Sequence, residues 1–513
     1  MSSMINTNLI SLNAQQNLST NQASLATSIQ RLSSGLRINS AKDDAAGLAI
    51  AARMTSQVNG LTQAARNAND GISMAQTAEG GLGTITDLLQ RMRTLAVQAA
   101  NSTNSASDRA SLQAEVSQDQ QEVNRVANTT QFNGLNVLDG TLNNAQFQVG
   151  ANANQTISFS IGNAQATALG NNTVGANAAT AATTLTQAHA SATTGTVDAN
   201  VFLAQALTIQ GNGTTVTIPN TTLTKGSSGY AVAQAVNAAS GSTGVTATAT
   251  TTATLGGFAA GSVSLVIQGA PTAAGAANPV TVSATLATAT DVGGLAAAIN
   301  AQTGATGITA TANLTAGTIS LNQGQGYDIG VDNLTAQAAI TVTGTTSAGA
   351  AGTAVTLAAT GAAGDTATVG AAVKFNGPSA FTVSSSVATS GIFDTANAAV
   401  GSTLASVASI DVTSLTAGLP TGANNAIAII DAALTNVNAS RGSLGALQNR
   451  FTSTISNLQT TSENVTAARS RVQDADFAAE TANLSRGQIL SQAGTAMLAQ
   501  ANQLPNEVLT LLR

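Results

Sequence analysis

The chain has 513 residues with no Cys, no Trp and one His, and charged residues make up only 8% of it. Disulfides and thiol nucleophiles are excluded, and a His-based metal site or Ser-His-Asp triad would need His189, which we place in an exposed Ala/Thr-rich loop. Three Lys, 2% aromatic residues and a net charge of -6 argue against nucleic-acid binding.

The first ten residues have no basic region followed by an apolar core, so we predict no classical signal peptide. Small apolar runs such as Ala45–Ala52 are far shorter than the roughly 18 residues that a membrane span requires. We therefore expect no membrane insertion. Composition alone fits a cytoplasmic protein and an exported one equally well.

Apolar residues recur at alternating spacings of three and four near the N-terminus, which predicts a helix with a narrow packing seam. These positions are Ile5, Leu9, Leu12, Leu25, Ile29, Leu32 and Leu36. A second seam runs from a cap at Asp43 or Asp44 to about Asn101, with slack expected at Gly71 and residues 80–83. Such a helix would be about 85 Å long.

Ser105 and Asp108 have capping-box spacing and predict the start of a shorter helix that folds back on the long one. Beyond it, alternating segments at 132–142 and 147–161 predict hairpins. Asn133-Gly134 and Asp139-Gly140 would supply their turns.

The middle of the chain contains an internal repeat at an offset of 63 residues. The sequence AVNA at 235–238 recurs as AINA at 298–301, and TGVTATA at 243–249 recurs as TGITATA at 306–312. The two copies cover about 207–254 and 263–322, and each predicts strands, one short helix, then strands.

The C-terminal part begins with a helical seam of about fifty residues from Gly422. Asp474 and Asp476 should break and recap it, starting a last helix that stops before Pro505. Narrow seams need partners, so we expect both termini to pack together, although an ordinary helix bundle also fits the pattern. The predicted fold class is α+β multidomain, with a long coiled-coil-like bundle formed by both termini and β-rich inserted outer domains.

No enzymatic site emerges, and we expect no cofactor. Gly324-Gln325-Gly326 is followed by Gly330, one residue too late for a dinucleotide fingerprint. The carboxylate pairs Asp43 with Asp44 and Asp328 with Asp332 more often cap helices or face solvent than perform acid/base catalysis.

Both ends of the chain contain distinctive segments. Near the N-terminus they are INTN at 5–8, SLNAQ at 11–15 and RLSSGLRINSAKDDAAG at 31–47. Near the C-terminus they are AARSRVQDADF at 467–477 and QLPNEVLTLLR at 503–513. Through these segments the chain resembles bacterial flagellin over about 170 N-terminal and 100 C-terminal residues.

The resemblance implies a subunit that self-assembles into an extracellular filament and leaves the cell through the flagellar type III apparatus. It also implies an export chaperone, cap and junction proteins as partners. The expected inner core is 1–44 with 473–513, the rod is 45–176 with 404–472, and the surface insertion is 177–403. Polymerisation would depend on the seven N-terminal seam residues from Ile5 to Leu36 named above. It would also depend on the C-terminal residues Phe477, Leu484, Ile489, Met497, Leu504, Val508 and Leu511.

Flagellins of this type are also recognised by a leucine-rich-repeat innate immune receptor. The family's contact motif falls on residues 90–98, with Arg91, Leu95 and Glu115 matching its core, whereas Thr94 stands where related sequences often have an acidic residue. Leu95 equally fits a helix-packing role, with Arg91 and Glu115 as exposed or intersubunit charges. Two other functions stay open: a hook-filament junction or other axial protein, and a surface adhesin.

Overall fold

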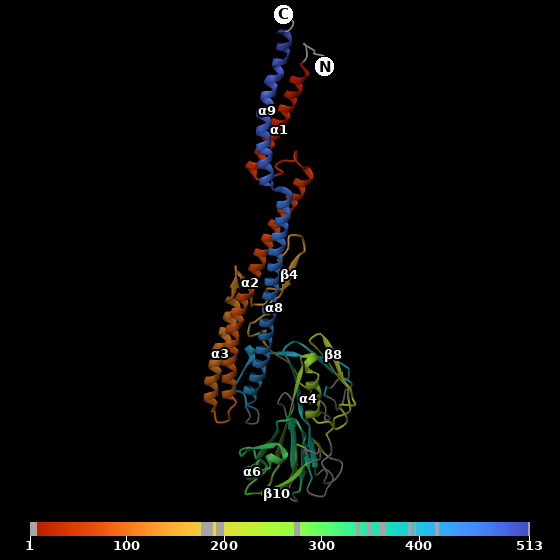
Figure 1. Cartoon of the computed structure of the whole chain (residues 1–513). Helices are drawn as coiled ribbons and strands as arrows, with labels where there is room; N and C mark the ends of the chain where they lie inside the picture. The colour runs from red at the N-terminus through yellow and green to blue at the C-terminus, as the bar shows by residue number, and fades with distance from the viewer. Residues whose placement is uncertain are drawn as a thin grey trace. The chain divides into compact units, whose positions relative to one another are not determined.

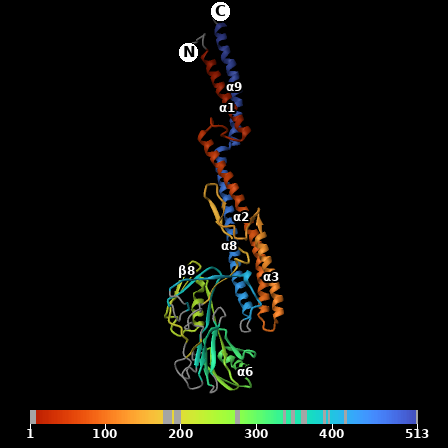
Figure 2. The ribbon, with the colours of Figure 1, turned by 180° about the vertical axis from the view of Figure 1, so that it is seen from behind.

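The computed structural model describes residues 8–175, 188–190, 200–270, 278–334, 339–345, 351–358, 366–387, 392–393, 397–415 and 420–510, with the backbone alone at His189 and at 504–510. Within these ranges, five long helices carry the two ends of the chain (Figures 1 and 2). They are α1 (Leu9–Ser34), α2 (Ala45–Ala99), α3 (Ala106–Thr129), α8 (Thr421–Gln473) and α9 (Phe477–Thr510).

Local sequence fixes where these helices begin. At the start of α2, the Asp44 carboxylate accepts the backbone N–H three residues later at 2.8 Å. At α3, Ser105 Oγ accepts the Asp108 N–H at 3.1 Å while the Asp108 carboxylate accepts the Ser105 N–H at 2.9 Å. Asp476 accepts two backbone N–H groups from the first turn of α9. All three predicted helix starts are confirmed.

Tertiary contacts divide the chain into two compact units. The terminal unit comprises residues 1–76, 143–160 and 444–513, and the central unit comprises residues 77–142 and 161–443. The long helices α2 and α8 each contribute residues to both units.

In the terminal unit, α1 lies beside α9, and a hairpin of β3 (Ala145–Gln148) and β4 (Thr156–Phe159) packs on the helical residues. Phe147 and Phe159 stack with ring centroids 5.7 Å apart, and both meet Phe451 of α8 edge-on. A Cβ atom at Gly71 of α2 would lie 2.7 Å from the Phe451 ring. This glycine therefore lets α2 and α8 approach closely behind the hairpin.

In the central unit, α3 lies beside the second part of α2 in both views (Figures 1 and 2). The predicted apolar face of α3 is buried, at Leu112, Val116, Val123 and Val126. The two-stranded hairpin of β1 (Gln131–Phe132) and β2 (Leu135–Asn136) follows. Its turn is Asn133-Gly134 as predicted, with both residues at positive φ.

Three further sheets lie in the described part of the central unit. The eight-stranded sheet has the order β12 (Ile308–Asn313), β13 (Thr318–Gln323), β9 (Thr246–Gly256), β18 (Ala372–Gly377), β5 (Gly170–Gly175) and β21 (Thr403–Ser406), with β15 (Ile340–Thr345) paired to β9 and to β16 (Ala351–Leu357). The five-stranded sheet has the order β11 (Pro279–Leu286), β10 (Gly261–Gln268), β14 (Ile329–Asn333), β17 (Thr366–Val369) and β6 (Ala188–Ala190). The four-stranded sheet has the order β20 (Val400–Gly401), β19 (Thr382–Ser385), β7 (Leu207–Gly211) and β8 (Thr214–Ile218).

The long strand β9 takes part in two hydrophobic cores. Ala247 and Ala249 belong to a core shared with the four-stranded sheet, whereas Ala253 and Leu255 belong to a core shared with the five-stranded sheet. Side chains of β9 alternate between buried Ala and exposed or half-buried Thr over most of its length. The sequence repeat thus corresponds to two cores that are joined through one strand.

The two repeats form equivalent structures, although each has two helices where the sequence predicted one. The first contains α4 (Gly229–Ala238) and α5 (Ser240–Thr243), and the second contains α6 (Gly293–Ala301) and α7 (Thr303–Thr306). Outside the repeats, a 3-10 turn, η1 (Val407–Ser409), precedes α8. Asn237 Nδ2 donates to the Ala247 carbonyl at 3.0 Å, and its Oδ1 accepts the Ala247 N–H at 2.7 Å. Asn300 makes the same two bonds to Ala310, at 2.8 and 2.7 Å. Each Asn amide therefore takes the place of a neighbouring strand.

Three sequence predictions were wrong in detail. His189 lies in strand β6, paired with Thr368, rather than in a loop. The last helix continues through Pro505 to Thr510, whereas the sequence predicted that it stops before Pro505. Asp139-Gly140 forms no hairpin turn, since the Asp139 carboxylate instead accepts the N–H two residues later.

No described helix is long and apolar enough to cross a membrane.

Candidate assembly surface

Helices α1 and α9 pack along a heptad seam in which small residues alternate with leucine. The less exposed positions are Ser11, Ala14, Leu18, Asn21, Leu25, Ser28 and Leu32 on α1, and Glu480, Leu484, Gly487, Ser491, Gly494, Leu498 and Ala501 on α9. At the far end, Asn8 Nδ2 donates to the Ala501 carbonyl at 2.7 Å, and Ser11 Oγ donates to Asn502 Oδ1 at 2.8 Å. The two helices are therefore in register over their described length.

Two glycines on α9 receive leucines from α1. A Cβ atom at Gly487 would lie 3.2 Å from Leu25 Cδ1, and one at Gly494 would lie 3.2 Å from Leu18 Cδ1. Both distances are tight for carbon atoms, so each leucine fills the space that a side chain on α9 would occupy. Leu18, Gly487 and Gly494 were not among the residues predicted from the sequence, although the seven-residue spacing of the two glycines was a usable signal.

A short backbone pairing ties the ends of these helices together. The Arg37 N–H donates to the Gln473 carbonyl at 2.7 Å, and the Ala475 N–H donates to the Gly35 carbonyl at 3.0 Å. Gly35 ends α1 at a φ of 70°, a left-handed conformation that glycine adopts without a steric penalty. These bonds join the loop that follows α1 to the junction between α8 and α9.

Few charges contribute to the pairing of α1 with α9. Arg31 Nη1 lies 4.0 Å from the carboxylate of Glu480, which is largely buried. In the loop after α1, hydrogen bonds from the backbone N–H groups of Ser40 and Asn39, and then from the Ser40 hydroxyl, hold the pKa of Asp43 below its usual value. Packing rather than electrostatics therefore dominates this pairing.

Among the side chains that the structure describes, eight large apolar ones on α1 and α9 are exposed to solvent, with exposed fractions between 42% and 66%. They are Leu9, Ile10, Leu12, Ile29, Phe477, Ile489, Leu490 and Met497. Single exposed apolar residues are common on protein surfaces, but eight of them on one helix pair indicate an interaction surface. We call these eight residues the outward apolar face.

The predicted polymerisation residues divide between the seam and this face. Leu25, Leu32 and Leu484 lie in the seam, and Leu36 is half-buried beside Asp474 at the helix junction. The members of the outward apolar face that we predicted are Leu9, Leu12, Ile29, Phe477, Ile489 and Met497. Ile5 and Leu511 lie outside the described residues, as do the side chains of Leu504 and Val508.

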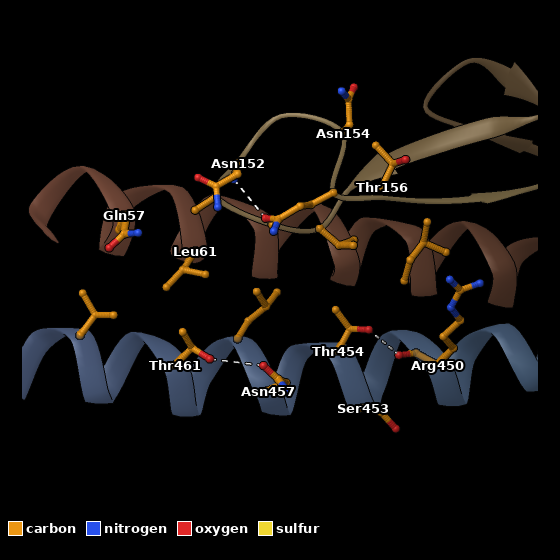
Figure 3. A pocket seen from close by; sticks show the side chains of 17 residues that line it. Gln57, Leu61, Asn152, Asn154, Thr156, Arg450, Ser453, Thr454, Asn457 and Thr461 are labelled. Carbon is orange, nitrogen blue, oxygen red and sulfur yellow. Dashed lines mark hydrogen bonds between the residues drawn. The ribbon is translucent and has the colours of Figure 1, made fainter. Parts of the chain in front are cut away.

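A groove of about 690 Å³ lies between α2, the loop joining β3 to β4, and α8 (Figure 3). The close-up shows Gln57, Leu61, Asn152, Asn154, Thr156, Arg450, Ser453, Thr454, Asn457 and Thr461 around it. A second groove of about 680 Å³ shares Leu61 and Leu458 with the first and extends to Ala467 and Ser470. Both grooves are lined mainly by Leu, Ala and uncharged polar side chains. Within the described residues, no cluster of His, Asp or Glu suits a metal ion.

The predicted receptor-recognition residues lie on α2 and α3 in the central unit. Leu95 is buried, whereas Arg91 and Glu115 are exposed and lie 3.5 Å apart. Arg91 also lies 3.3 Å from Asp119, a nearly buried residue that our sequence analysis did not select. Burial raises the pKa of Asp119 while Arg91 acts to lower it.

Both ends of the chain and part of its middle match models of known protein families. Residues 5–143 match the bacterial flagellin N-terminal helical region, residues 427–512 match the C-terminal helical region, and residues 206–261 match the flagellin hook IN motif. The B-type flagellin of Pseudomonas aeruginosa is 42% identical over 519 residues, and a flagellin of Salmonella typhimurium is 40% identical over 541 residues. Both alignments cover 100% of each chain.

A solved structure of FliC from Burkholderia pseudomallei is 21% identical, covering 74% of this chain and 99% of that one, at a TM-score of 0.29. The assignment rests on the matches of residues 5–143 and 427–512 and on relatives aligned over their whole length. The resemblance stated from the sequence is confirmed: the chain belongs to the bacterial flagellin family, whose members are structural subunits of the flagellar filament.

Proposed function

We propose that the chain polymerises into a flagellar filament by burying its outward apolar face against other copies of itself. The observation that carries this proposal is the position of those eight side chains, which point away from the seam between α1 and α9. Each one fully buried in an assembly would contribute about 1.5–3 kcal/mol. Contacts between unlike surfaces that do not close into a ring give an open helical polymer.

We also expect the two terminal segments that contain α1 and α9, here called the tips, to fold fully only on assembly. The seam between α1 and α9 offers few large apolar groups, because Gly, Ser, Ala and Asn fill many of its positions. We therefore expect the circular dichroism of the monomer to show less helix than the filament does. Full helicity at both tips of the monomer would contradict this part of the proposal.

We assign the parts of the chain as follows. Residues 1–44 with 473–513 form the inner core, residues 45–176 with 404–472 form the rod, and residues 177–403 form the outer insertion. The support is that α1 and α9 pair independently of the sheets, whereas the repeats form two cores of their own. The expected partners are an export chaperone of the type III apparatus, cap and junction proteins, and further copies of this chain.

Charge substitution on the outward apolar face tests the main proposal. In Ile489→Asp, a carboxylate replaces a side chain that is 66% exposed, so the monomer should fold normally but fail to polymerise. Gln492→Asp adds the same charge at an exposed polar position of α9 and serves as the matched control. Ordinary filaments from Ile489→Asp, judged by sedimentation and electron microscopy, would rule out the proposed interface.

Electron microscopy of the unmodified protein separates the alternative functions. Filaments that dissociate with heat or acid and regrow on neutralisation support the filament subunit. Particles that never polymerise alone support a junction protein, and ligand binding by residues 176–403 would support an adhesin.

Recognition of the monomer by a leucine-rich-repeat immune receptor is a second proposal, supported by the exposed pair Arg91 and Glu115. Arg91→Ala should reduce receptor signalling, whereas Arg125→Ala, which removes an exposed arginine paired within α3, should not. Unchanged signalling by Arg91→Ala would exclude this arginine from the contact.

A further inference from the structure

The chain contains two tyrosines, and they contact each other. The rings of Tyr230 and Tyr327 stack with their centroids 4.5 Å apart and their planes inclined by 24°. Tyr230 lies on α4 of the first repeat, and Tyr327 lies in the loop that joins β13 to β14 after the second repeat. Neither residue is fully buried, so small molecules in solution have access to the pair.

Hydrogen bonds hold both residues in this arrangement. The Tyr230 N–H donates to the Gly326 carbonyl at 2.8 Å, and the Tyr327 N–H donates to Gln323 Oε1 at 3.1 Å. Thr251 Oγ1 of β9 donates to the Tyr327 carbonyl at 2.6 Å. The backbone of both tyrosines is therefore held by hydrogen bonds at the positions that bring the two rings together.

The composition makes these phenols the main sites for one-electron oxidation. The chain has no Cys and no Trp, and methionine is oxidised by oxygen-atom transfer to the sulfoxide. Burial, and then the hydrogen bond with the Tyr230 hydroxyl, raise the pKa of Tyr327. Tyr327 is a neutral phenol at neutral pH, as tyrosines ordinarily are, and its oxidation releases a proton together with the electron.

We propose that Tyr230 and Tyr327 form an oxidative cross-linking site, at which a dityrosine bond joins the first repeat to the loop that follows the second. A haem peroxidase with hydrogen peroxide is the class of oxidant required. Each phenol loses one electron and one proton, and the two tyrosyl radicals then form a carbon–carbon bond between ring positions adjacent to their hydroxyls. The hydrogen on each bonded carbon moves to oxygen to restore the aromatic ring, while the peroxide takes up two electrons and two protons to give two waters.

The bond would close a loop that contains β9 and the whole second repeat. Cross-links that close long loops stabilise a fold by restricting its unfolded chain. Within a structural protein without cysteine, this bond would do what a disulfide does in other proteins. The inference concerns the outer part of the chain and does not depend on how the subunits polymerise.

The test treats dilute full-length monomer with a haem peroxidase and limiting hydrogen peroxide. Dityrosine fluorescence should appear, and mass spectrometry should find a peptide pair containing residues 230 and 327, lighter by two hydrogens. The yield per chain should not depend on protein concentration, because both rings belong to one molecule. The thermal unfolding temperature of the oxidised protein should rise.

Tyr230→Phe and Tyr327→Phe are matched controls, since each keeps a stacked ring but removes one phenol. Each should abolish the fluorescence while the circular dichroism stays that of the parent protein. The inference fails if no dityrosine forms, if it forms only between chains, or if chain unfolded in urea gives as much intrachain product as folded chain.

Discussion

Gly487 and Gly494 show how two missing side chains set the distance between α1 and α9. Each faces a leucine whose Cδ1 atom would lie 3.2 Å from an added Cβ. Some other helical glycines face open space, and a Cβ atom at Gly442 of α8 would meet nothing within 4 Å. The role of a glycine in these helices therefore depends on its neighbour and not on its backbone conformation.

Gly487→Leu is expected to weaken the pairing of α1 with α9 by about 1–3 kcal/mol, because the new side chain overlaps Leu25. Filaments of this variant should dissociate at a lower temperature, as followed by light scattering during heating. Gly442→Leu should leave that temperature unchanged or raise it slightly, since leucine favours a helix by up to about 1 kcal/mol over glycine. Equal stability of both variants would show that the α1–α9 seam contributes little.

Asp328 is a second residue whose surroundings determine its behaviour. Its Oδ2 accepts a hydrogen bond from Asn200 Nδ2 at 2.8 Å, while no described residue donates to its shielded Oδ1. Burial raises the pKa of this carboxyl to about 7, although the Asn200 bond acts in the opposite direction. The folded state therefore binds a proton that the unfolded state releases.

The free energy of unfolding should accordingly fall as pH rises from 3.8 to about 7, and then level off. Asp328→Asn removes the charge and should stabilise the β-rich part of the chain by on the order of 1–3 kcal/mol above this range, with a flatter pH profile. Tyrosine fluorescence reports this part selectively, because both tyrosines of the chain lie there. Exposed Asp291→Asn is the control, and identical pH profiles for Asp328→Asn and the parent protein would contradict the assignment.

At the scale of elements, each repeat protects a strand with one asparagine. The Asn300 amide bonds both the N–H and the C=O of Ala310 in β12, the edge strand of the eight-stranded sheet. Unpaired edge strands invite pairing with other chains. The asparagine satisfies two backbone groups that a neighbouring strand would otherwise use.

Asn300→Ala should therefore lower the free energy of unfolding by about 1–3 kcal/mol and promote aggregation of the monomer. Thr311→Ala, at an exposed position of the same strand, tests for a general effect of substitution there. Size-exclusion chromatography after mild heating provides the measurement. If both variants remain equally monomeric, the asparagine does not protect the edge.

The sequence predicts the starts of elements better than it predicts their faces. Caps at Asp44, Ser105 and Asp476 are local, since the capping side chain and its partners lie within a few residues. The seam of α1 is not local. The apolar periodicity selected Leu9, Leu12, Leu25 and Ile29 as one set. Of these four, only Leu25 packs against a glycine of α9, whereas the other three are exposed.

At the scale of the whole molecule, the α+β class, the helical termini and the β-rich middle all follow from the sequence and are confirmed. The repeat was visible because TGVTATA and TGITATA both encode a left-handed glycine followed by a strand, at Gly244 and Gly307. The strand order of the sheets was not visible, because β9 pairs with strands far apart in sequence. His189 was misplaced because β6 has three residues and too short a pattern.

As a flagellin, the chain is a filament subunit, and the central claim is that its two tails complete their packing only with other copies. Removing residues 1–44 and 473–513 tests this most directly, with electron microscopy under conditions in which the full chain polymerises. We predict folded monomers whose β-rich part unfolds as in the parent protein and which form no filaments. Filaments of ordinary form from the shortened chain would contradict the account.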